Sequence, residues 1–273
     1  MHRTIDEIEF TIFDTETTGL DPGGGDRIVE IAAQRLKADR IIAEFSTLVN
    51  PGRAPSAAAF AVNHITPEML ENAPLPGDVL PGFLDFIAGS CLCSYNLVFD
   101  LGFLNAELAR LDRPLPAQTA LVDVLGMARK LLPKLSSHSL CNVAQSLDIR
   151  TAQEHRALAD VVLTREVFRI LVAALADKGI REFGQFLSLF SLRSNLVSDI
   201  IAQKSAKIQE AIDAGLEITI KYFSRSSADV SERTVIPKEI KEVVPFAYLV
   251  GFCKLKHQER TFRIDHIMDI RTA

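Results

Sequence analysis

Two acidic residues close together end an apolar run near the start of the chain. Asp14 and Glu16 lie in FDTETTGL, residues 13–20. In a β-strand, residues i and i+2 face the same side, so both carboxylates would point to one place and could hold a cation. Seen alone, the pair is better explained as solvated acids at the end of a strand. Further acids are needed to establish a site.

A histidine and two more acids occur later in the chain. His155 and Asp160 lie in EHRALADVV, and on one continuous helix their side chains would be about 140° apart. They could share a site only if His155 lies in the loop before the helix and Asp160 in its opening turns. Asp100 stands at a strand-to-helix junction in SYNLVFDLGFLNAEL. The simpler alternatives are an exposed loop histidine and two helix N-terminal acids that favour the helix dipole.

The surrounding pattern predicts a mixed α/β sheet with helices packed on it. EFTIFD, RIVEIAAQRL and IIAEFSTLVN are rich in β-formers and predict an antiparallel meander of three strands. Thr66-Pro67-Glu68 has the form of a helix start. A further helix is expected over residues 77–89, with Pro81 in its first turn. CLCSY predicts a short strand, and helices are expected over 99–111, 139–147 and 157–175.

Three motifs in this order resemble those of the DnaQ-like, or DEDDh, 3′-5′ exonucleases, which include the proofreading subunit of bacterial replicative polymerases. They are FDTETTGL, NLVFDLGFLNAEL and HRALAD, and NHITPEML is similar to the family's His-Gly-Ile-Thr segment. The resemblance covers nearly all of residues 8–175. It implies a ribonuclease H-like fold and hydrolysis of phosphodiester bonds from the 3′ end of single-stranded nucleic acid, with DNA favoured over RNA.

The resemblance also implies roles for individual residues. Asp14, Glu16, Asp100 and Asp160 would bind two divalent cations, and His155 would be the general base. An all-carboxylate site suits Mg²⁺ or Mn²⁺ better than zinc. The expected substrate-binding residues are Thr15, Thr17, Thr18, Leu20, His64, Asn96 and Phe99. The second motif often has His-Asn where this chain has Tyr95-Asn96, which puts a substrate contact at Tyr95 in doubt.

The pattern changes after residue 179. A helix is expected over 205–215, and LEITIKYF, RTVIP, FAYLVGFCKL, RTFRI and IMDI predict strands of a small β barrel or sandwich. Residues 205–271 resemble a WYL domain, although Ala247 and His266 replace the family's Trp and Arg. The resemblance implies an Sm-like β barrel that binds nucleic acid or a nucleotide-type ligand. The residues carried over are Tyr222, Arg225, Arg233, Tyr248, Lys254, Arg260 and Arg263, and the alternative is an ordinary solvated sheet face.

Three units are therefore expected: an exonuclease domain over 1–178, a helical connection over 179–204 and a WYL-like domain over 205–273. The net charge of −5 divides unevenly. Residues 1–179 hold 16 Lys and Arg against 23 Asp and Glu, and residues 180–273 hold 14 against 12. Any basic surface for nucleic acid should thus lie late in the chain.

Composition and cysteine usage indicate a cytoplasmic protein with no membrane span. Hydrophobic residues make up 48% of the 273, without an apolar run long enough to cross a bilayer. The four cysteines form no CxxC pair, so reduced thiols are expected rather than a zinc site or disulfides.

The segment GQFLSLFSL raises the question of a protein partner. Its Gln185, Leu187, Leu189 and Phe190 resemble peptides that dock on bacterial sliding clamps, with the spacing off by one. An apolar segment packed between the domains explains it equally well. For the whole chain, the competing function is a catalytically idle nucleic-acid-binding or ligand-sensing regulator on an exonuclease fold.

Overall fold

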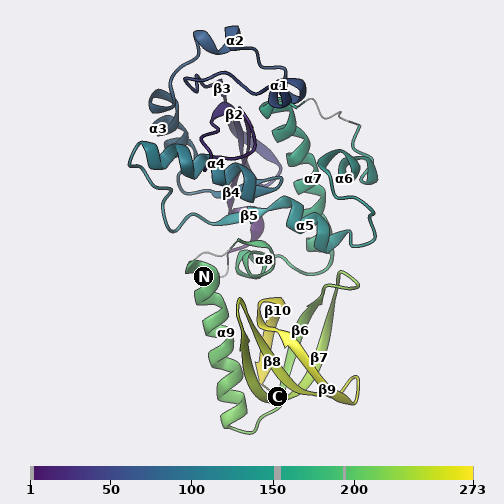
Figure 1. The fold of residues 1–273 in the computed structure, drawn as a ribbon. Helices are drawn as coiled ribbons and strands as arrows, with labels where there is room; N and C mark the ends of the chain where they lie inside the picture. Colours follow the sequence, from purple (N-terminus) through teal and green to yellow (C-terminus); the bar gives the residue numbers. More distant parts are fainter. Residues whose placement is uncertain (1–2, 151–154, 193–194, 273) are drawn as a thin grey trace.

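A five-stranded mixed sheet forms the centre of the N-terminal half. The computed structural model describes residues 3–150, 155–192 and 195–272 (Figure 1). The strands are β1 (Glu9–Thr17), β2 (Ile28–Lys37), β3 (Arg40–Leu48), β4 (Cys91–Ser94) and β5 (Leu121–Asp123), in the order β3-β2-β1-β4-β5. The first three are antiparallel, whereas β4 runs parallel to β1 and β5 parallel to β4. The predicted meander is confirmed.

Helices cover both faces of this sheet. One face packs on α3 (Pro76–Ile87) and α4 (Leu97–Arg110), and the other on α5 (Val124–Leu131), α6 (Leu140–Ser146) and α7 (Ala157–Asp177). Because side chains alternate along a strand, Ile12 of β1 joins the core beneath α7 while Phe13 joins the core beneath α3 and α4. The short elements are η1 (Ile5–Glu7), α1 (Ala57–Asn63) and α2 (Pro67–Glu71).

Two expected helix starts have different outcomes. Thr66 caps α2 by accepting from the Met69 N–H, with Pro67 in the first turn, as predicted. The prediction that Pro81 lies in a first turn is wrong, because α3 begins at Pro76 and Pro81 lies inside it. Pro76 occupies the initial position, where the missing N–H costs little.

The C-terminal half is a second, fully antiparallel five-stranded sheet with one long helix against it. Its strands are β6 (Ile218–Ser224), β7 (Asp229–Val243), β8 (Phe246–Cys253), β9 (Gln258–Arg263) and β10 (Ile267–Thr272), ordered β10-β6-β7-β8-β9, with η2 (Ile264–His266) between β9 and β10. The long helix is α9 (Asn195–Asp213), whose Ile208 and Ala211 pack in the core of this sheet. It runs through residue 205, the expected domain boundary. Residues 193–194 of the expected connection lie outside the described residues.

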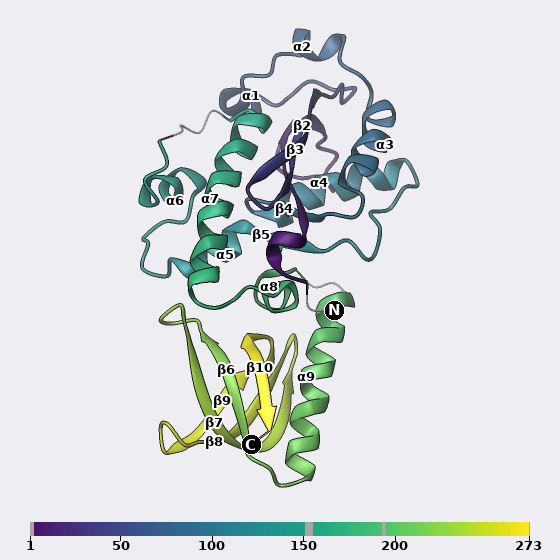
Figure 2. The same cartoon turned by 180° about the vertical axis from the view of Figure 1, so that it is seen from behind.

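Helix α8 (Phe183–Phe190) lies between the two halves of the molecule, as both views show (Figures 1 and 2). Phe186 and Phe190 are buried in one core that also contains Phe223 and Met268 of the second sheet. The Gln185 amide donates to the Met268 carbonyl at 3.2 Å, and the Ser188 hydroxyl donates to the Asp265 carbonyl at 3.0 Å. These contacts support the interpretation of GQFLSLFSL as an apolar segment packed between the domains.

The described helices and cysteines agree with the expectations from composition. None of the helices in residues 3–150, 155–192 and 195–272 combines the length and the apolar character that a bilayer span requires. All four cysteines are free, and Cys91, Cys93 and Cys253 are buried.

The position of Phe186 predicts a large stability effect. Its ring is fully buried and lies 5.8 Å from that of Phe10 and 5.5 Å from that of Phe190. Phe186→Ala should lower the free energy of unfolding by about 3–5 kcal/mol, because it leaves a cavity that the surrounding helices cannot close. Urea titration followed by circular dichroism measures this, with exposed Val244→Ala as the control. A Phe186→Ala loss as small as the control's would contradict the packing of α8.

Candidate active site

Three acids meet at the end of β1 that lies beside the start of α7. Asp14, Glu16 and Asp160 each offer a carboxylate oxygen, and these atoms all lie within 4.8 Å of one another. Asp14 and Glu16 face α7 because they follow Ile12 on the same side of β1. The neighbouring strand places Ala32 directly opposite Asp14. This small side chain leaves room for the helix to approach.

His155 and Asp160 lie as the loop-and-helix alternative requires. Helix α7 begins at Ala157 with Arg156 as its N-cap residue, so Asp160 falls in the first turn. His155 precedes the cap, is exposed and has φ of 52°, in the left-handed region. The chain therefore turns sharply at His155 before it enters the helix.

Asp100 stands beside the three acids rather than within their group. It lies in the first turn of α4 and is buried. One carboxylate oxygen accepts from the Thr15 N–H at 2.9 Å and from the Thr15 hydroxyl at 2.7 Å, and the other accepts from the Ser94 hydroxyl. Strands β1 and β4 thus both fix the position of this carboxylate.

Burial and mutual repulsion raise the pKa values of these acids. Burial raises the pKa of Asp14 well above its usual range, and the charges of Asp100 and Asp160 add to the effect. The pKa of Glu16 rises to about 8, first through burial and then through Asp160. Burial raises the pKa of Asp100 to about 6 against the opposing hydrogen bonds from Ser94 and Thr15. A divalent cation would relieve this repulsion.

Comparison with known proteins agrees with this geometry. The family model described as Exonuclease matches residues 11–168, which is more than half of the chain. The chain belongs to the exonuclease family. A second model, the WYL domain, matches residues 203–272. Both domain resemblances seen in the sequence are confirmed.

Several relatives of this exonuclease are replication proteins. It is 38% identical over 254 residues to a "DNA polymerase III PolC-type" of Oceanobacillus iheyensis, covering 91% of this chain and 17% of that protein. It is 39% identical over 170 residues to "DNA polymerase III subunit epsilon" of Treponema pallidum, covering 62% of this chain and 78% of that one. The chain spans at most 28% of the length of the first three curated relatives that it matches.

Solved structures show the same fold. "Exonuclease X in complex with 5' overhanging duplex DNA" is 26% identical, with a TM-score of 0.51, and the match covers 70% of this chain and 98% of that one. E. coli exonuclease I in complex with a dT13 oligonucleotide is 16% identical with a TM-score of 0.57, over 97% of this chain and 66% of that one. The second match shows likeness of fold alone.

The three threonines of the first motif hold the turn that follows β1 and the carboxylate of Asp100. The Thr17 hydroxyl donates to the Gly19 carbonyl at 2.6 Å, and the Thr18 hydroxyl donates to Asp26 at 3.0 Å. Thr15 is committed to Asp100, as described above. All three threonines are buried, so their hydroxyls position this turn and the second-motif acid.

The other expected substrate-binding residues are more accessible. Leu20 is 83% exposed, and His64 and Asn96 are exposed in left-handed backbone conformations. Phe99 is half-buried against Phe103, with ring centroids 5.0 Å apart. Tyr95 donates its hydroxyl to the His138 carbonyl at 2.7 Å, so the residue that departs from the family pattern has a structural contact.

Two buried polar residues beside the acids were not predicted from the sequence. Asn63 is buried, donates to the Thr17 carbonyl at 3.4 Å, and a hydrogen bond from its side chain counteracts the rise in the pKa of Glu16. Glu30, also buried, lies directly opposite Glu16 on β2 and binds Arg156. The position of Asn63 directly before His64 in NHITPEML was an available signal. Nothing local marks Glu30.

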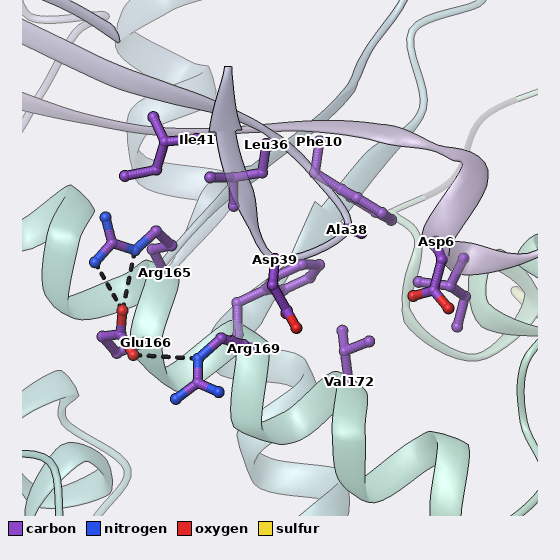
Figure 3. Close-up of a pocket in the computed structure, with 12 residues that line it drawn as sticks. Asp6, Phe10, Leu36, Ala38, Asp39, Ile41, Arg165, Glu166, Arg169 and Val172 are labelled. Atoms are coloured by element: carbon purple, nitrogen blue, oxygen red, sulfur yellow. Dashed lines mark hydrogen bonds and ion pairs between the residues drawn. The ribbon is translucent and has the colours of Figure 1, made fainter. Parts of the chain in front are cut away.

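A separate pocket lies against the later turns of α7, away from its first turn. It has a volume of about 450 Å³ and lies between the β2–β3 hairpin and α7, with Phe10, Leu36 and Val172 among its apolar residues (Figure 3). None of the acids of the candidate site lines this pocket. Its charged residues Arg165 and Arg169 bind Glu166 of the same helix.

The residues expected to bind a ligand in the second sheet do not all share one face. Residues directly opposite in an antiparallel pair face the same side. Arg233 therefore lies on the side of buried Ile220, whereas Arg263 lies opposite Tyr248 on the other side. Arg263 also binds Asp265 and stacks on Phe246, 3.7 Å from the ring centroid.

The remaining members of that set differ in exposure, from half-buried Tyr222 to exposed Lys254. Tyr222 packs on Phe262, with ring centroids 5.2 Å apart, and Lys254 binds Glu217 at 2.6 Å. Arg225 and Arg260 are exposed. The residues carried over from the WYL resemblance are thus divided between two faces of the sheet and its turns.

The donor set of the candidate site fits hard divalent cations. Its ligand atoms are carboxylate oxygens, which Mg²⁺ and Mn²⁺ prefer. Because the pKa values of Asp14 and Glu16 are raised, these carboxylates take up protons more readily when no cation is bound. Asp14, Glu16 and Asp160 are the residues that would hold the first ion.

This electrostatic arrangement predicts a pH-dependent stability. Because folding raises the pKa of Glu16 from 4.5 to about 8, its contribution to stability is present below pH 4.5 and is lost as the pH rises through about 8. In EDTA, the Tm should fall from pH about 5 to pH about 8, and Mg²⁺ should restore it mainly at the higher pH.

Differential scanning calorimetry with and without Mg²⁺ checks this expectation. The combined Asp14→Asn and Glu16→Gln variant removes two titrating groups, so its Tm should depend less on pH and on Mg²⁺. An equal Mg²⁺ effect in that variant and in the original protein would show that the ion binds elsewhere.

Proposed function

We propose that this protein is a metal-dependent 3′-5′ exonuclease that hydrolyses phosphodiester bonds from the 3′ end of single-stranded nucleic acid, with DNA favoured over RNA. The observation that carries the proposal is the meeting of Asp14, Glu16 and Asp160 within 4.8 Å, with Asp100 beside them. The family model and the DNA-bound state named for exonuclease X support it.

In the proposed mechanism the acids hold two divalent cations, Mg²⁺ or Mn²⁺. When bound, such ions activate water and stabilise the leaving 3′ oxygen. Thr15 and Ser94 hold Asp100 in a fixed orientation, so this carboxylate does not need to reorganise when the substrate arrives. His155 accepts the proton of the attacking water, since an imidazole can take up a proton near neutral pH.

The alternative is a catalytically idle regulator that binds nucleic acid or senses a ligand. Binding alone does not require repelling carboxylates in a partly buried group, whose cost is visible in the raised pKa values of Asp14 and Glu16. Retention of all five motif residues therefore favours an active enzyme.

Two substitutions test the mechanism. Asp14→Ala and His155→Ala should each lower hydrolysis of a 3′-labelled oligonucleotide in Mg²⁺ by at least about 100-fold, since each removes a group that acts on the reacting atoms. Exposed Asp85→Ala is the matched surface control. Circular dichroism confirms folding, and near-normal release of mononucleotides by either active-site variant would refute the mechanism.

The choice of substrate requires a direct comparison. Matched single-stranded DNA and RNA, each with a free or a blocked 3′ end, are incubated in Mg²⁺ and in EDTA. Faster loss of the DNA from free 3′ ends, abolished by EDTA, is the result that the proposal expects.

We also propose that the second sheet forms a WYL-like, Sm-like unit that contacts nucleic acid or a nucleotide-type ligand. It meets the exonuclease at the far end of α7, where Lys178 binds Asp229 at 2.9 Å. Asp160 lies 18 residues before Lys178, about 27 Å along the helix axis at about 1.5 Å per residue. At about 3.4 Å per stacked nucleotide, a strand that reaches both places needs about eight nucleotides.

Filter binding with oligonucleotides of increasing length tests that role. Arg233→Ala with Arg260→Ala should weaken binding of single strands longer than about eight nucleotides and leave shorter ones unaffected. The matched Arg→Lys pair should retain most of the affinity, because a lysine still contacts phosphate as a point charge. Equal affinity of all three proteins for long strands would refute the role.

Other expectations about the cellular setting remain predictions. Association with a polymerase is supported by relatives that are named as DNA polymerase III proteins. Docking on a sliding clamp through Leu189 and Phe190 would require both buried side chains to leave the core. We expect the protein to act in the cytoplasm.

A further inference from the structure

A buried carboxylate outside the three motifs connects the sheet to the start of α7. Glu30 of β2 is 5% exposed and lies directly opposite Glu16. Its carboxylate accepts from the Arg156 side chain at 3.0 Å through Nε and at 2.6 Å through Nη2. It also accepts from the Ala157 N–H at 3.0 Å. One side chain thus makes three hydrogen bonds to two consecutive residues.

These two residues form the N-terminus of α7. The first N–H groups of a helix have no partner within the helix, and a residue at the cap position commonly supplies one. Arg156 is the cap residue here, and its side chain makes no such bond. Glu30 supplies the acceptor from a different element of the fold, with a negative charge at the positive end of the helix dipole.

The partnership also answers an electrostatic problem. The charge of Glu30 contributes to the raised pKa values of both Asp14 and Glu16. The planar guanidinium of Arg156 neutralises it with two parallel hydrogen bonds, a geometry that lysine cannot reproduce. Removal of Arg156 would leave another uncompensated carboxylate next to the site.

We propose that Glu30 and Arg156 are positioning residues of this exonuclease. Their ion pair fixes where α7 begins on the sheet, and thereby sets Asp160 against Asp14 and fixes the position of His155 just before the helix. The pair touches neither substrate nor metal. This inference rests on the proposed function, because it requires that the acids and His155 act in hydrolysis.

The same strand and helix provide a matched control. Arg165 donates to Gln34 at 2.8 Å, so it also joins α7 to β2, but nine residues further along the helix. Arg165 lines the separate pocket and binds Glu166 (Figure 3). A contact that merely holds helix to sheet would make Arg156 and Arg165 equivalent in their effect on catalysis.

The experiment measures kcat and KM on a 3′-labelled single-stranded DNA in saturating Mg²⁺, using the full chain. Glu30→Gln and Arg156→Met should each lower kcat at least about tenfold, because small displacements of reacting groups are costly, while KM changes less than about threefold. Arg165→Met should keep kcat within about twofold. Arg156→Lys should give an intermediate kcat, since it retains the charge without the fork.

The double variant tests whether the two residues act together. Glu30→Gln with Arg156→Met should be no slower than the slower single variant, because the first substitution already breaks the shared contact. Thermal unfolding of every variant is followed in parallel. If Arg156→Met does not fold, Arg156→Lys and Glu30→Gln carry the comparison.

Two results would overturn the inference. One is a kcat within about twofold of normal in both Glu30→Gln and Arg156→Lys. The other is an equal loss of kcat in Arg165→Met. If Asp14→Ala and His155→Ala abolish hydrolysis in the same assay, either result refutes the positioning role alone. If those two variants remain active, the proposed function fails as well.

Discussion

Repulsion between partly buried carboxylates is the constraint on which the arrangement of the N-terminal half depends. Carboxylates gathered at the end of β1 lose hydration and oppose one another, and the raised pKa values of Asp14 and Glu16 record that cost. The neighbouring elements reduce it: β4 and β1 donate hydrogen bonds to Asp100, and Arg156 neutralises Glu30. Divalent cations bound between Asp14, Glu16 and Asp160 would relieve the repulsion that remains, so the fold and such ions would stabilise each other.

Most helices and strands were predictable because strand-forming segments and helix caps are visible over a few neighbouring residues. The strand-forming residues of β1, β2 and β3 predicted the meander, and Thr66-Pro67 predicted the start of α2. Two boundaries could not be predicted in this way. Pro81 lies inside α3 because the helix begins at Pro76, which takes the first helical position in its place. Strand β7 continues past Pro237 because a register shift between Pro237 and Glu239 accommodates the missing N–H.

The residues of the candidate site that could be predicted are those that stand in a short motif of chemically functional side chains. Asp14, Glu16, Asp100, His155 and Asp160 stand in three such motifs, and the structure gathers three of these acids, with Asp100 close by. Glu30 and Arg156 are 126 residues apart, and their contact depends on the register of β2 and on where α7 meets the sheet. Neither the register nor the position of α7 can be predicted from the residue types alone. The same is true of the second sheet, where pairing separates Arg233 from Arg263.

The apolar core around α8 has a consequence for the modularity of the chain. Two family models divide the sequence into separate regions, yet Phe186 and Phe190 share one core with Phe223 and Met268. Cutting the chain between the regions would uncover apolar surface on both fragments. The two regions therefore match separate family models in sequence but share one core in the structure. Any other domain joined to this exonuclease would need to present a matching apolar face to α8.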